Sequence, residues 1–139
     1  IGRLIGPEGD PRVQPFFDAL DGINALADRA DGFVWRLQTE AGNATELQPT
    51  PDPRLIVNLS VWRDLEALAT FAYRSGHAAQ LARRRDYFET FGSAFLALWW
   101  VRPGHRPDVD EGLARLWMID RFGPSPQAFT FAKPFAAPA

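Results

Sequence analysis

Hydrophobic positions in the first part of the chain alternate between strand and helix patterns. The apolar segment 1–5 predicts a short strand that glycine and proline residues end. Asp10 followed by a proline is typical of a helix start, and apolar residues recurring at helical spacing predict a helix over 11–28. Pro15 favours a later start for this helix. Aromatic and β-branched residues over 33–39 predict a second strand.

The strongest strand pattern covers 54–62 and follows a loop at 40–53 that is rich in proline and has no apolar period. Alternate residues of a strand point to opposite faces. One face is entirely hydrocarbon and consists of Leu55, Val57, Leu59 and Val61. The other face is mixed and consists of Ile56, Asn58, Ser60 and Trp62.

Helix signals follow this strand. Asp64 is a suitable cap for a helix that carries apolar residues to about residue 72, and Ser75-Gly76 predicts a break before a second helical piece over 77–88.

The last third of the chain predicts two strands around a helix. The segment 94–102 is apolar on both faces, which favours a central strand of a sheet. Asp108 with Glu111 three residues later resembles a capping box, and the apolar residues that follow predict a helix ending near residue 123. A final strand is expected over 128–132.

The element order β-α-β-β-α-β, with an extra helix and strand, predicts an α+β fold of the ferredoxin-like type, an antiparallel sheet with helices packed on one face. The chain of 139 residues has the length of one domain, 1–139. No helix remains to cover the other face of the sheet. We therefore expect the mixed face of 54–62 to form a partner interface or the wall of a pocket.

Composition excludes several classes of function. The chain has no cysteine, which excludes disulfides, thiolate nucleophiles and cysteine-based metal sites, and its two histidines exclude an all-histidine metal triad. A net charge of -2 argues against a nucleic-acid partner. The longest apolar run, 94–101, is too short to span a bilayer. The first residues do not show the charged and then apolar pattern of a secretory signal peptide. We therefore expect a cytoplasmic protein with no membrane partner.

The two histidines, His77 and His105, are predicted to lie in different surroundings. Tyr73 and His77 share a helix face with apolar residues. Apolar surroundings can shift the pKa of His77, so its imidazole can act as a base or an acid near neutrality. The alternative is a histidine in the core that forms its hydrogen bonds with the backbone. His105 lies between Gly104 and Arg106 in a predicted turn, which favours an exposed loop residue.

Other candidate binding residues are polar or aromatic. Asn58 and Ser60 share one strand face and either line a pocket or make hydrogen bonds across a dimer. Arg36 could hold a carboxylate or enolate with both arms of its guanidinium, or lie on a solvated or interface face. Trp62, Tyr73 and Trp100, with Trp99, either wall an aromatic ligand pocket or belong to the core.

Residues Val61–Leu68, continuing through Phe71, Ser75 and His77, look like the dimeric α/β-barrel superfamily that includes antibiotic-biosynthesis monooxygenases. Over nearly the whole chain the sequence more closely resembles the uncharacterised DUF3291 family. The residues that carry this resemblance are Gly32–Leu37, Asn58–Trp62, Tyr73–His77, Leu98–Trp100 and Gly104–Pro107. The resemblance implies a ferredoxin-like homodimer whose two sheets form a barrel, with a small-molecule cavity in each subunit between sheet and helices.

The resemblance favours an enzyme similar to the cofactor-independent monooxygenases and cyclases of this superfamily. Their substrate, a phenol or enol, is deprotonated in an apolar cavity and reduces dioxygen without a metal. His77 would be the base, while Asn58, Ser60, Arg36 and Tyr73 would orient the substrate and Trp62 and Trp100 would wall the cavity.

Two other functions remain open. One is a haem-handling protein with His77 as axial ligand, although haem-degrading relatives tend to carry the ligand about one turn later, where this chain has Leu81. The other is a non-catalytic homodimer that binds a small hydrophobic or aromatic molecule. The absence of a nucleophile elbow, a phosphate loop and a metal cluster favours this third hypothesis.

Overall fold

The structure is a computed structural model that describes residues 1–39, 42–45, 47, 49–75, 79 and 82–139. The chain forms two compact units, an N-terminal unit of Gly2–Thr90 and a C-terminal unit of Phe91–Ala139 with Ile1. Helices and short antiparallel strand pairs make up the regular structure, which confirms an α+β protein. In the described residues, no helix is both long and apolar enough to cross a membrane.

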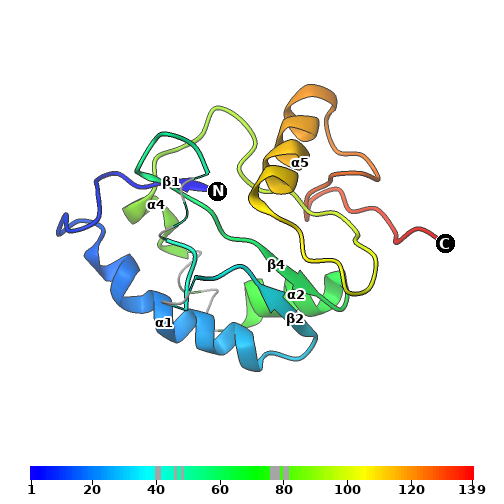
Figure 1. Ribbon diagram of the computed structural model, residues 1–139, viewed down its shortest axis with the longest axis horizontal. Helices are drawn as coiled ribbons and strands as arrows, with labels where there is room; N and C mark the ends of the chain where they lie inside the picture. The colour runs from blue at the N-terminus through cyan, green and yellow to red at the C-terminus, as the bar shows by residue number, and fades with distance from the viewer. Residues whose placement is uncertain (40–41, 46, 48, 76–78, 80–81) are drawn as a thin grey trace. The chain divides into compact units, whose positions relative to one another are not determined.

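The strands of the N-terminal unit pair through one shared segment. β1 (Gly2–Arg3) is antiparallel to β3 (Leu55–Ile56), and β2 (Phe33–Arg36) is antiparallel to β4 (Ser60–Trp62), which lies beside it in Figure 1. β3 and β4 both belong to the segment predicted as one strand over 54–62. The prediction of one continuous strand is wrong, because β1 pairs only with the start of this segment and β2 only with its end.

Helix α1 covers Gln14–Arg29 and begins three residues later than Asp10-Pro11 predicts. The carbonyl of Asp10 instead closes a turn by accepting hydrogen bonds from the backbone N–H groups of Val13 (3.1 Å) and Gln14 (3.2 Å). Pro15 then falls in the first turn of α1, where a missing N–H costs no helical hydrogen bond. The later start that Pro15 favours is therefore confirmed.

Helix α2 covers Leu65–Arg74 and begins at the predicted cap, where the Asp64 carboxylate accepts a hydrogen bond from the backbone N–H of Ala67 at 2.8 Å. Its buried side packs on β4, since the Phe71 ring stacks on Trp62 with ring centroids 5.0 Å apart. The expectation that no helix covers the mixed face of 54–62 is therefore wrong at Trp62. Of the helical piece predicted over 77–88, the structure describes α4 (Arg84–Tyr87), while 77, 78, 80 and 81 lie outside the described residues.

The C-terminal unit contains α5 (Val109–Phe122), which begins at the predicted cap Asp108. The segments 94–102 and 128–132 do not form the predicted strands: they share a single bridge between Leu98 and Phe129 with two backbone hydrogen bonds of 2.8 Å. Side-chain packing replaces the expected sheet. Trp99 donates a hydrogen bond to Glu111 on α5, and Trp100 packs against Phe129, which leaves both tryptophans half-buried. Phe95 and Leu96 of the same segment are exposed.

Each unit has its own buried side chains. The core of the N-terminal unit consists of Leu4, Val13, Ala27, Leu55, Leu59, Ala67, Phe71, Ala72 and Tyr87. The core of the C-terminal unit contains Leu116, Ala128 and Phe129.

Candidate functional site

A hollow of about 410 Å³ opens in the N-terminal unit between the carboxyl end of α1 and helix α2. This volume lies within the range of small-molecule sites, about 300–1,000 Å³. The residues that line it are Leu26, Ala30, Asp31, Arg63, Asp64, Glu66, Ala67, Thr70, Phe71, Arg74 and Ser75.

The apolar part of this hollow has a firm support. Ala67 and Phe71 are buried, and the Trp62 ring stacks behind Phe71 with an interplanar angle of 27°. The indole N–H of Trp62 donates a hydrogen bond to the hydroxyl of Ser60 at 2.9 Å. The structure thus brings the predicted residues Ser60 and Trp62 together, and it places Trp62 behind Phe71 rather than among the lining residues.

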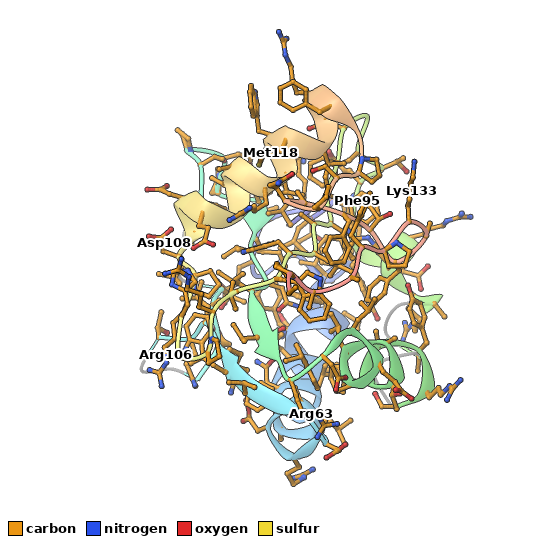
Figure 2. The ribbon with its side chains drawn as sticks, turned by 90° about the vertical axis from the view of Figure 1, so that its right-hand side faces the viewer. Arg63, Phe95, Arg106, Asp108, Met118 and Lys133 are labelled. Atoms are coloured by element: carbon orange, nitrogen blue, oxygen red, sulfur yellow. The ribbon has the colours of Figure 1, made fainter. Side chains whose placement is uncertain are left out.

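The polar part of the hollow is dominated by Arg63, which is labelled in Figure 2. Its guanidinium donates hydrogen bonds to Asp31 (2.9 Å) and Asp64 (3.1 Å). The hydrogen bond from Arg63 lowers the pKa of Asp31; the backbone N–H of Ala67, followed by Arg63, lowers the pKa of Asp64. Both carboxylates are therefore ionised near neutrality, and the charge of Arg63 is compensated within the protein.

The predicted cation Arg36 is engaged elsewhere. Its guanidinium donates to both carboxylate oxygens of Asp28 (2.8 and 3.2 Å) and to the carbonyl of Gly42 (2.5 Å). These bonds tie β2 to α1, and the hydrogen bond from Arg36 lowers the pKa of Asp28. In this arrangement the guanidinium of Arg36 binds Asp28 of the protein itself instead of a ligand.

The remaining predicted site residues that the structure describes do not line the hollow. Asn58 and Tyr73 are exposed in the N-terminal unit. Trp100 belongs to the C-terminal unit, where its indole N–H donates to the carbonyl of Phe135 at 2.9 Å. His77 lies outside the described residues.

His105 in the C-terminal unit has a carboxylate partner. Arg102-Pro103-Gly104-His105 forms a turn in which the N–H of His105 donates to the carbonyl of Arg102 at 3.0 Å and Gly104 has φ 84°, the geometry of a type II turn. The turn sets Nε2 of His105 2.7 Å from a carboxylate oxygen of Glu111. His105 is exposed, as the sequence predicts, but it is oriented by this contact.

Glu111 collects further donors. Its second carboxylate oxygen accepts a hydrogen bond from the indole N–H of Trp99 (3.0 Å) and lies 3.6 Å from a guanidinium nitrogen of Arg115. In the predicted capping box Glu111 would return a bond to the helix start, yet its side chain is used by His105 and Trp99. Sequence reasoning missed this cluster, although the position of Glu111 three residues after the cap Asp108, labelled in Figure 2, was the available signal.

Replacing Glu111 with glutamine is expected to lower the free energy of unfolding by about 1 kcal/mol at pH 7, because hydrogen bonds to a charged group are stronger than neutral ones. Partial burial raises the pKa of Glu111, but the hydrogen bonds from His105 and Trp99 more than offset this, so the pKa is lowered from its ordinary value of 4.5. A lowered carboxyl pKa contributes stability that is present above the unfolded pKa and disappears as the pH falls through the folded pKa. Urea unfolding should therefore show the difference between the two proteins shrinking as the pH falls below 4.5.

Asp110→Asn is the matched control for this measurement, because Asp110 is the exposed neighbour of Glu111 in the first turn of α5. It should cost only the modest helix-dipole contribution, a few tenths of a kcal/mol. Equal losses in the two variants, or a Glu111→Gln effect that persists unchanged at acid pH, would contradict the assignment.

The elements and the hollow define an α+β protein with a recess of small-molecule size. Among the residues that the structure describes, no group of three or more acidic, histidine or cysteine side chains could hold a metal ion. The chain belongs to the family described as Domain of unknown function (DUF3291), whose profile matches residues 1–139. No curated protein and no solved structure matches it.

Proposed function

We propose that this protein is a small-molecule enzyme whose substrate binds in the hollow between α1 and α2. The observation that carries the proposal is the combination of sufficient volume with an apolar floor and an ionic rim in one recess. Phe71 presents hydrocarbon to a ligand, while Asp31, Arg63 and Asp64 form a rim whose charges hold one another in place.

The chemistry proposed is proton abstraction from a phenol or enol by His77, which follows the lining residue Ser75 by two positions in the chain. The resulting carbanion reduces dioxygen: an activated methylene becomes a carbonyl that keeps one oxygen atom, and the other leaves as water with the two hydrogens. The substrate supplies the electrons, so no cofactor takes part. The stacked Phe71 and Trp62 rings support this chemistry by excluding water from one side of the substrate.

The fold proposed for the whole molecule is a ferredoxin-like sheet that forms a dimeric barrel with a second copy in the cytoplasm. The pairing of β1 and β2, which flank α1, with opposite ends of the segment 55–62 supports it, because a split βαβ unit places its third strand between the first two. Val34 on β2 is apolar and exposed, which supports a further partner for this strand.

A non-catalytic binding protein is the second candidate. The observation that favours it is that the described lining residues include no histidine and no pair of a base with a nucleophile. The hydroxyl of Ser75, which lines the hollow, already donates a hydrogen bond to the carbonyl of Phe71. Such a protein would hold a hydrophobic metabolite without converting it.

Oxygen uptake tests the proposed activity. Protein treated with a chelator is mixed with a panel of phenols and 1,3-diketones, and oxygen consumption is measured for the wild type, His77→Ala and His105→Ala. We expect consumption that His77→Ala abolishes without loss of ligand binding. Loss in His105→Ala alone would place the base in the C-terminal unit, and binding without consumption in the wild type would favour the non-catalytic candidate.

A further inference from the structure

The charges around the hollow are unequally compensated. Arg63 is shared between Asp31 and Asp64, with three hydrogen bonds of 2.9 to 3.3 Å to these two carboxylates. A ligand that needed Arg63 would have to displace two carboxylates already held at hydrogen-bond distance. The guanidinium of Arg63 therefore links the α1–β2 turn to the start of α2 through exposed ion pairs.

Arg74 is the other cation that lines the hollow, and its situation is different. It is exposed at the last position of α2, and within the described part of the chain no hydrogen bond or ion pair engages its side chain. The carboxylate of Glu66, also in the lining, belongs to the same helix but eight residues earlier, about 12 Å along the helix axis. Glu66 is too far away to neutralise Arg74.

Arg74 also lies on the correct side of α2. Residues at spacings of three, four and seven share one face of a helix, and Ala67, Thr70, Phe71 and Arg74 follow this spacing. Ala67 and Phe71 are the buried floor of the hollow, so Arg74 stands at the end of the floor nearest the carboxyl end of α2. Among the described residues, the lining of the hollow therefore combines the apolar side chains of Ala67 and Phe71 with the guanidinium of Arg74 beside them.

From this arrangement we infer that the hollow takes an anionic ligand, with a flat apolar body over Phe71 and a carboxylate or enolate oxygen bound by the guanidinium of Arg74. The inference rests on the proposed function and names its substrate class. A planar guanidinium matches the two oxygens of a carboxylate. Arg36, which the sequence predicts as a residue that holds a carboxylate or enolate, already donates its hydrogen bonds to Asp28 and Gly42.

Paired probes test the inference. Benzoate and benzamide share size and shape but differ in charge, and both can be titrated into ¹⁵N-labelled full-length protein while the amide signals of Ala67, Thr70 and Phe71 are followed. We expect benzoate to bind more tightly than benzamide. Arg74→Gln should weaken benzoate about tenfold and leave benzamide unchanged, because only the charged hydrogen bonds are lost.

Arg85→Gln is the matched control, since Arg85 is an exposed arginine on α4 that does not line the hollow. Benzoate affinity unchanged in Arg85→Gln supports a local contact, whereas equal weakening in both variants indicates general electrostatic attraction and overturns the inference. Equal binding of the two probes, unaffected by Arg74→Gln, overturns the anionic substrate class but keeps the hollow as a binding site. Absence of signal shifts at the hollow with either probe overturns the inference together with the proposed site.

Discussion

Phe129→Ala is expected to lower the free energy of unfolding of the C-terminal unit by about 3–5 kcal/mol, the usual cost of removing a buried phenylalanine ring. The Phe129 side chain is 2% exposed. Its ring packs against Trp100 and Phe135, with centroid distances of 6.4 and 6.0 Å. Truncation leaves a cavity beneath the backbone bridge to Leu98, so both the packing and the bridge are weakened.

Urea unfolding followed by tryptophan fluorescence measures this loss, because Trp99 and Trp100 lie beside the bridge in sequence. Phe122→Ala removes the same ring from a position that is 69% exposed, on the last residue of α5. That control should stay within about 0.5 kcal/mol of the wild type. Similar losses in the two variants would show that Phe129 is not the core residue of this unit.

Gly32→Ala is expected to cost about 2–5 kcal/mol, the sum of a left-handed backbone and of overpacking. Gly32 has φ 82°, a region that residues with a Cβ adopt at a cost. An added Cβ would also lie 2.4 Å from the Cβ of Ala67, in the first turn of α2. Neither atom is the end of a flexible side chain, so the turn and the helix would have to separate.

Gly9→Ala separates these two causes. Gly9 has φ 95° in the same unit, and an added Cβ there would meet no atom within 4 Å. It should show only the conformational cost of about 1–2 kcal/mol. Thermal unfolding of both variants gives the comparison, and equal shifts would contradict the close approach of Gly32 to Ala67.

Helix boundaries were largely predictable because their signals are local. Asp64 and Asp108 each cap the helix that their sequence context indicates, with hydrogen bonds of 2.8 Å to the backbone three residues later. The absence of a strand over 94–102 was not predictable, because a short apolar run fits a central strand and also an irregular segment whose side chains contact a helix. Trp99 donates a hydrogen bond to Glu111 on α5, which lies twelve positions later in the sequence.

The candidate site was predictable only in part. The alternation of the 54–62 segment placed Ser60 and Trp62 together, which the hydrogen bond between them confirms. The engagement of Arg36 by Asp28 was not foreseen, since nothing in the alternation of a strand tells which carboxylate of the preceding helix will reach it. The pairing of His105 with Glu111 likewise required the turn geometry of Gly104.

The sequence by itself determined the α+β class, the caps of α2 and α5 and the family, because periodicity, capping and family patterns are written in neighbouring residues. Only the tertiary structure decided that Trp62 stacks on Phe71 and that carboxylates compensate Arg63. It also decided that, among the described residues, no carboxylate pairs with Arg74. Charge compensation depends on which side chains come within about 4 Å. Chain folding brings Arg63 to Asp31, 32 positions away, and sequence spacing alone does not specify such a contact.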